Sequence, residues 1–145
     1  MRLVLAVFAL CLAVSFPALA DEMATRYGKL STNEDNFLLI DGMQIKPDIQ
    51  GNNSLSLLSL FRIDGADVVL VQNNGGTACP ALFLFVTVAP SGVSQSASFG
   101  TCSDDIRTTQ DGNKLTVSMP KTSGKGSTKY EFHRGVVMEN GKLVK

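Results

Sequence analysis

The sequence has few of the residues that build metal centres and cofactor sites. Its 145 residues contain one histidine, His133, which excludes a histidine-rich metal site. Its glycine-rich stretches, residues 74–77 and 124–126, lack the spacing of a phosphate-binding loop. The 13 basic and 13 acidic side chains balance. We therefore expect no metal, no cofactor and no nucleic-acid partner.

Long apolar runs are also scarce, and the clearest one lies at the start of the chain. Arg2 precedes an unbroken apolar stretch over residues 3–14, Pro17 interrupts the apolar run, and Ala18-Leu19-Ala20 places alanine where signal peptidase requires small residues. We expect residues 1–20 to be a signal peptide, cleaved after Ala20, and the mature protein to be periplasmic or secreted. Since no second run is as long, we expect no membrane span in the mature protein.

Cysteines are few, and cleavage would leave only Cys79 and Cys102. An even pair in an exported protein is most simply one disulfide. The bridge would close a loop of 23 residues. In the chain-entropy model, a loop of this length stabilises the fold by about 3 kcal/mol.

The segment between these cysteines predicts a hairpin. Residues 81–89 are almost wholly apolar, Pro90-Ser91-Gly92 suits a tight turn, and serines alternate through residues 93–99. If residues 89 and 93 pair, Cys79 lies opposite Ser103, one residue from Cys102. A small bulge would then bring the two sulfurs within bonding distance. Because residues 81–89 are apolar at both parities, we expect this strand to be covered on both faces.

Strand signals dominate the rest of the chain. Four dipeptides that favour hairpin turns lie near apolar runs: Asp41-Gly42, Asp64-Gly65, Asp111-Gly112 and Asn140-Gly141. We predict a mainly β fold, with eight or nine antiparallel strands in a meander that forms a small barrel or sandwich. Residues 37–145 would form this single domain, after a weakly structured arm over residues 21–36. Residues 53–61, rich in leucine, leave open one short helix.

Catalytic combinations are scarce. Cys102 could act as a nucleophile with His133 as its base, but a disulfide would remove the thiol. The neighbouring carboxylates of Asp104 and Asp105 point to opposite faces of a strand, so they do not converge. His133 with a nearby carboxylate remains the basis of an alternative prediction, a hydrolase with an unrecognised site.

A cationic, glycine-containing loop is the best candidate for binding. Residues 112–145 carry seven bases and two acids, and the loop between Pro120 and Thr128 contains Lys121, Ser123 and Lys125, with Lys129 just beyond it. Such a loop could enter an acidic cleft or bind an anionic polymer. The alternative is a solvated hairpin tip without a partner.

Residues 119–135 resemble part of one family, the periplasmic inhibitors of C-type lysozymes. Met119-Pro120, Ser123-Gly124, Tyr130 and His133-Arg134-Gly135 occur in a similar order. The spacing from Ser123 to Tyr130 is longer than in that family, and the family's N-terminal Tyr-x-Cys element is missing. The resemblance implies a small barrel that inserts a Ser-Gly loop into an acidic cleft, with Ser123 and Lys125 as contacts.

The sequence thus predicts an exported, non-enzymatic binding protein, such as a periplasmic inhibitor or immunity-type module acting through surface loops. Its partner would be a protein or an anionic ligand, and its oligomeric state stays open. Besides the hydrolase, the alternative is an envelope-associated structural protein that self-assembles through strand edges.

Overall fold

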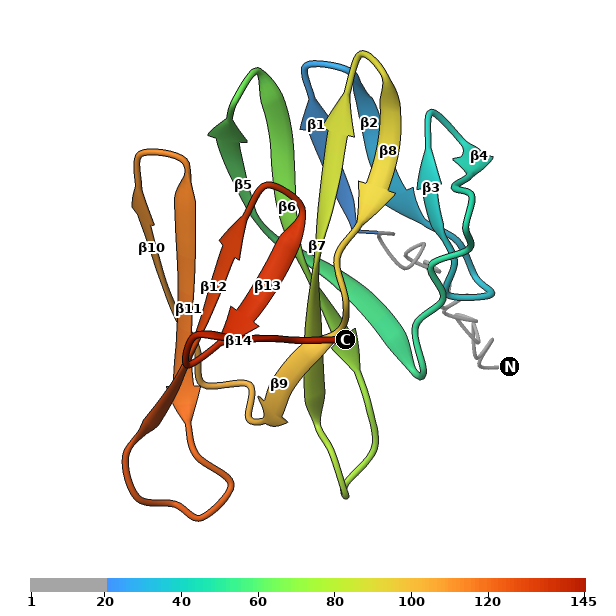
Figure 1. Ribbon diagram of the computed structural model, residues 1–145. Helices are drawn as coiled ribbons and strands as arrows, with labels where there is room; N and C mark the ends of the chain where they lie inside the picture. The colour runs from blue at the N-terminus through green and yellow to red at the C-terminus, as the bar shows by residue number, and fades with distance from the viewer. Residues whose placement is uncertain (1–20) are drawn as a thin grey trace, which may run out of the picture.

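The computed structural model describes residues 21–145, which fold into three antiparallel sheets without a helix (Figure 1). The predicted signal peptide, residues 1–20, lies outside the described residues. The N-terminal sheet contains, in order, β1 (Glu22–Thr25), β2 (Gly28–Thr32), β3 (Leu38–Ile40) and β4 (Met43–Gln44). The central sheet contains β5 (Ser54–Ile63), β6 (Ala66–Asn74), β7 (Ala81–Ala89) and β8 (Gly92–Gln95), and β9 (Phe99–Cys102) also pairs with β7. The C-terminal sheet contains β10 (Arg107–Asp111), β11 (Lys114–Pro120), β12 (Ser127–His133), β13 (Val136–Glu139) and β14 (Lys142–Leu143).

The predicted antiparallel β fold is confirmed, but its architecture differs from the single meander that we expected. Over residues 21–145 the strands separate into three open sheets, and they do not close into a barrel. The strands are also more numerous than expected, because short hairpins form near both ends of residues 21–145. The layers stack in the manner of a sandwich.

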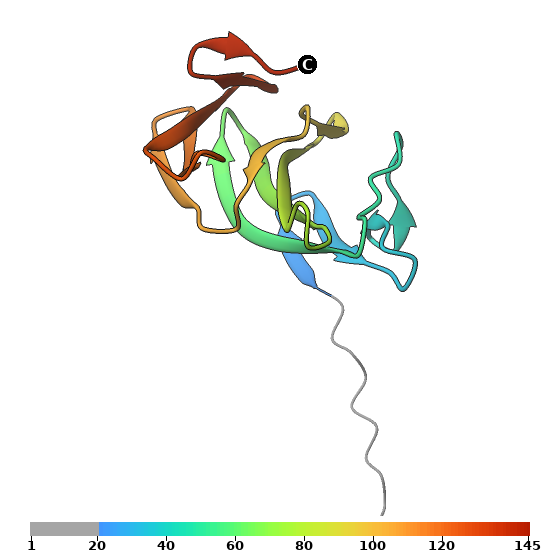
Figure 2. The same ribbon diagram turned by 90° about the horizontal axis from the view of Figure 1, so that it is seen from below.

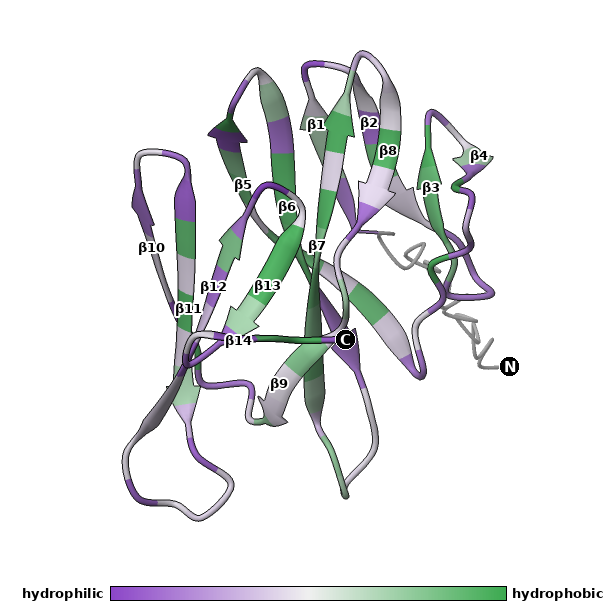
Figure 3. Ribbon diagram, in the orientation of Figure 1, coloured by the Kyte–Doolittle hydropathy of each residue, from purple (hydrophilic) through white to green (hydrophobic). Residues whose placement is uncertain are grey.

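The central sheet lies between the other two sheets (Figure 2). It shares one hydrophobic core with each of them. Along β7, Phe83 and Phe85 pack into the core with the C-terminal sheet, whereas Leu84 and Val86 pack into the core with the N-terminal sheet. Successive strand residues point to opposite faces, so an apolar residue at every position is buried only when both faces are covered. The two-sided burial predicted for this strand is confirmed, and Figure 3 shows hydrophobic colouring over much of it.

Aromatic side chains fill the core between the central and C-terminal sheets. The ring centroid of Phe85 lies 5.4 Å from that of Phe99 and 4.6 Å from that of Phe132. Phe99 in turn lies 4.9 Å from Tyr130. Rings at these separations contribute attraction beyond the area they bury. The aromatic cluster therefore fixes the C-terminal sheet against the central one.

The expected weakly structured arm, residues 21–36, instead forms the β1–β2 hairpin over much of its length. Its turn is held by a long-range ion pair. The Arg26 backbone N–H and Nε donate to the Asp67 carboxylate on β6 at 2.6 and 2.8 Å, and the Tyr27 hydroxyl donates to the Gly65 carbonyl. The partners lie about forty residues away in sequence, so no local pattern reveals them.

Residues 53–61, where a short helix was left open, belong almost entirely to the strand β5. This strand pairs with β6 and has a bulge between Leu57 and Ser59. The extra residue, Leu58, is 39% exposed. Beyond it, the alternation of side chains between the two faces of the strand shifts by one residue. Leu55, Leu57 and Leu60 therefore pack on one face, a spacing that obscures the period-two pattern of a strand.

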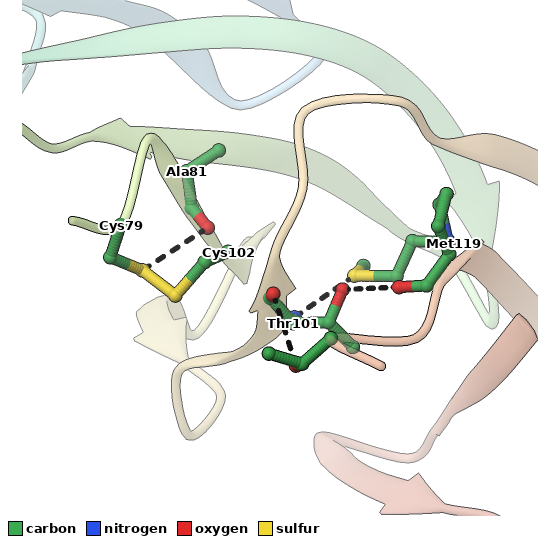
Figure 4. The surroundings of a disulfide bond; sticks show 7 residues. Cys79, Ala81, Thr101, Cys102 and Met119 are labelled. Atoms are coloured by element: carbon green, nitrogen blue, oxygen red, sulfur yellow. Dashed lines mark hydrogen bonds between the residues drawn. A yellow bond between two sulfur atoms is a disulfide. The ribbon is translucent and has the colours of Figure 1, made fainter. Parts of the chain in front are cut away.

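The predicted disulfide joins Cys79 and Cys102, whose Cα atoms lie 4.6 Å apart (Figure 4). The predicted pairing of residues 89 and 93 is wrong by one, because the turn has two residues and Ala89 pairs with Gly92. The return strand is also interrupted: β8 ends at Gln95, and β9 resumes the pairing with β7. The expected bulge lies between β7 and β9, where the register shifts.

Tight turns connect most of the strands. Asp41-Gly42, Asp64-Gly65 and Asn140-Gly141 have positive φ at both residues, as type I′ hairpins require. The same geometry occurs at Arg134-Gly135, with φ values of 48° and 83°. That turn lacks the usual Asp or Asn, and the sequence pattern therefore did not indicate it.

Candidate functional site

The predicted binding loop is an exposed hairpin tip at the end of β11 and β12 (Figure 1). Lys121, Ser123 and Lys125 are all exposed. Within the loop, the Gly124 N–H donates to the Lys121 carbonyl at 2.8 Å, and the Lys121 N–H donates to the Gly126 carbonyl at 3.1 Å. The glycines adopt positive φ, 74° and 80°, and this lets the chain turn without steric strain. The tip is thus a folded loop that displays its side chains to solvent.

The outer face of the C-terminal sheet continues this cationic surface. Arg107 on β10 pairs with Ser118 on β11, and Ser118 pairs with Lys129 on β12. Residues directly opposite one another project to the same face, and Arg107 and Lys129 are both exposed. Sequence reasoning selected Lys129 but missed Arg107. Only the pairing of β10 with β11 brings Arg107 to this place, since it lies well before the loop in sequence.

Four cations at this end of the sheet have no carboxylate partner within residues 21–145. They are Arg107, Lys121, Lys125 and Lys129. By contrast, Lys114 farther along the same face lies 3.1 Å from Glu131. Neighbouring cations without carboxylate partners make the local electrostatic potential more positive and attract an anionic surface. We call these four residues the cationic cluster.

A surface hollow of about 300 Å³ lies at the base of the loop. Its lining is Asp105, Arg107, Ser118, Met119, Pro120, Gly126 and Ser127. The guanidinium of Arg107 and the two serine hydroxyls can donate hydrogen bonds to a carboxylate. Asp105 adds one negative charge at the hollow, which offsets part of the positive charge of the cationic cluster.

The residues considered for catalysis do not come together. The Cys102 sulfur is bonded to Cys79, so it offers no thiolate nucleophile in this state. His133 is exposed, and its Nδ1 lies 3.4 Å from the Asn113 carbonyl oxygen. Among the described hydrogen bonds and ion pairs, none joins His133 to a carboxylate. Residues 21–145 also contain no cluster of three metal-ligating side chains.

No protein-family model matches this chain, and no similar curated protein or solved structure was found. The small barrel implied by the resemblance to lysozyme inhibitors also differs from the three open sheets of this fold. In the described part of the chain, no helix has the length and hydrophobicity to cross a bilayer.

Proposed function

We propose that the protein is an exported, non-enzymatic binding protein that places its β11–β12 loop in an acidic cleft of a partner protein. The observation that carries this proposal is the cationic cluster. Its four side chains gather at one end of one sheet and have no carboxylate partner within residues 21–145. A partner that supplies the missing negative charge would gain both attraction and orientation from this cluster.

The shape of the loop favours a concave protein surface. The loop extends beyond the ends of β11 and β12 (Figure 1), and a protruding loop buries most area when a cleft surrounds it. Thr122 and Ser123 add hydroxyl groups that hydrogen-bond in either direction. The rigid sheets behind the loop lower the entropy lost when the partner binds.

The disulfide supports export. Such bonds persist in oxidising compartments and are rare in the cytosol. Together with the signal-like residues 1–20, the Cys79–Cys102 bond favours a periplasmic or secreted protein. An oxidising compartment would also keep Cys102 from acting as a nucleophile. The hydrolase alternative instead needs a carboxylate next to His133, and none of the described hydrogen bonds or ion pairs joins His133 to one.

Titration of a short fluorescein-labelled polyglutamate peptide tests the proposal without a known partner. We expect the mature protein to bind the peptide, with a dissociation constant that rises with salt. Lys125→Glu should weaken binding about tenfold at low ionic strength, because one attraction becomes a repulsion. Its melting temperature should not change, since Lys125 is exposed and unpaired within residues 21–145.

Lys142→Glu is the matched control. Lys142 is also exposed and changes the net charge equally, but it lies outside the loop and the cationic cluster, on the edge strand β14, two strands away from β12. If both variants lose affinity equally, binding reflects net charge alone and the proposed site is wrong. Wild-type protein that does not bind the peptide at low salt would also contradict the proposal.

A further inference from the structure

We propose that Thr101, held in place by the Cys79–Cys102 disulfide, is a positioning residue for the β11–β12 loop. The inference rests on the proposed function, and it identifies what holds the binding loop in position. It makes partner binding depend on a disulfide that lies outside the C-terminal sheet.

Thr101 contacts the base of the loop through three hydrogen bonds (Figure 4). Its hydroxyl donates to the Pro120 carbonyl at 2.6 Å. Its backbone N–H donates to Met119 Sδ at 3.2 Å, and its carbonyl accepts from the Thr122 hydroxyl at 3.5 Å. Thr101 therefore contacts the last two residues of β11 and the second residue of the loop.

These bonds tie the loop to the rest of the molecule. Within residues 21–145, the other hydrogen bonds of the loop join Lys121 to Gly124 and to Gly126, and so remain inside the hairpin. The tip lies beyond the ordered ladder of β11 and β12, whose last pair is Pro120 with Ser127. Without Thr101, the orientation of the tip would depend on the hairpin alone.

The disulfide fixes the strand that presents Thr101. β9 has only four residues, and its pairing with β7 is irregular between Phe83–Phe99 and Ala81–Cys102. Phe99 anchors the first end of β9 in the aromatic core, at 3% exposure. Cys102 anchors the other end through its bond to Cys79. Thr101 directly precedes this second anchor, so loss of the disulfide frees the end of β9 that contacts the loop.

A fixed loop binds more tightly than a mobile one, because less conformational entropy is lost on association. Thr101→Val keeps the size of the side chain but removes the hydroxyl that donates to Pro120. The net contribution of a neutral hydrogen bond to stability corresponds to about a fivefold change in an equilibrium constant. We expect about a fivefold loss of affinity for the polyglutamate peptide.

Amide hydrogen exchange measures the positioning itself, without any ligand. The amides of Lys121 and Gly124 are the reporters, since both are hydrogen-bonded inside the loop. We expect Thr101→Val to speed their exchange about fivefold. Thr101→Ser, which restores the hydroxyl, should exchange like the wild type. Thr109→Val, on the exposed face of β10, is the matched control and should also exchange like the wild type.

Cys79→Ser combined with Cys102→Ser tests the role of the disulfide. We expect the exchange of Lys121 and Gly124 to accelerate and peptide affinity to fall, as in Thr101→Val. If the double variant does not fold, Thr101→Val and Thr101→Ser still decide whether Thr101 positions the loop, and exchange of the wild type with and without dithiothreitol decides the role of the disulfide. Unchanged exchange of Lys121 and Gly124 after reduction would overturn that role.

The two measurements separate failure of the inference from failure of the proposed function. Unchanged exchange in Thr101→Val overturns the positioning role, whatever the affinity. Faster exchange in Thr101→Val with unchanged affinity for the peptide would show that the positioning by Thr101 does not matter for binding. If the wild type does not bind the peptide, the proposed function fails, and the exchange rates alone then decide whether Thr101 positions the loop.

Discussion

Asp67 shows how one residue joins two layers of this protein. Its carboxylate has no solvent exposure and accepts hydrogen bonds from the backbone and guanidinium of Arg26, in the turn of a different sheet. Burial by itself would raise the pKa of Asp67. The hydrogen bonds and positive charge of Arg26 outweigh burial, so the pKa of this carboxyl lies below its ordinary value.

The lowered pKa makes this contribution to stability depend on pH. A carboxyl whose folded-state pKa is below its unfolded-state pKa stabilises the fold above the unfolded pKa, and this stabilisation is lost as pH falls through the folded pKa. Asp67→Asn should therefore be less stable than the wild type at neutral pH, and the difference should shrink as the solution is acidified. Urea unfolding across a pH series measures this difference.

Asp104→Asn is the control for that series, because Asp104 is exposed and makes no ion pair within residues 21–145. Its stability should follow the wild type at every pH. A constant difference between Asp67→Asn and the wild type down to strongly acidic pH would show that the ion pair does not couple the sheets as described.

At the scale of elements, β7 is the strand on which both cores depend. Phe85 has no solvent exposure and contacts rings from β9 and β12. Phe85→Ala should lower the free energy of unfolding by about 3–5 kcal/mol, because it leaves a cavity between the central and C-terminal sheets. Denaturant unfolding measures this loss.

Met43→Ala provides the comparison, since Met43 is 66% exposed and lies on the two-residue strand β4. We expect its stability to stay within about 0.5 kcal/mol of the wild type. A loss below about 1 kcal/mol for Phe85→Ala would contradict a central position for β7, since a buried aromatic ring costs more to truncate.

The elements that could be predicted are those with local signals. The apolar run of β7, the turn dipeptides and the cysteine pair each carry their information within a few residues or by simple count. The β1–β2 hairpin could not be predicted, because its turn is held by Asp67 on β6. β5 was ambiguous because the bulge at Leu58 breaks the alternation that identifies a strand.

The candidate site was predictable in the same partial way. Its lysines cluster in sequence, so the charge of residues 112–145 revealed them. Arg107 and Thr101 reach the loop through strand pairing and a long-range hydrogen bond, with partners 11 and 19 residues away. Such contacts depend on the register in which neighbouring strands pair. The hydrophobic periodicity of the sequence does not specify that register.

At the scale of the whole molecule, the sheet edges bear on the alternative of self-assembly. Open edges offer unpaired backbone groups to other chains. Here the edge strands β4 and β14 have only two residues each. The long edge strand β5 has a bulge, and its Leu57 N–H donates to the Asp21 carboxylate at 3.2 Å. These features limit edge-to-edge pairing between copies at β4, β5 and β14, whereas the five-residue edge strand β10 has no such feature.

The three layers also separate the residues that stabilise the fold from the proposed binding surface. The central sheet is buried on both faces, whereas the cationic cluster lies partly on the outer face of the C-terminal sheet and partly on the loop at its end. Side chains on that outer face can change without disturbing either core. The central claim is therefore local: one loop and its neighbouring strands should contact an acidic partner.

Amide chemical-shift mapping with unlabelled polyglutamate peptide tests that claim most directly. We predict progressive shifts at residues 121–126 and at Arg107, Ser118 and Lys129, with the N-terminal sheet unchanged. Shifts that spread evenly over all exposed lysines, or that centre on the N-terminal sheet, would contradict the account.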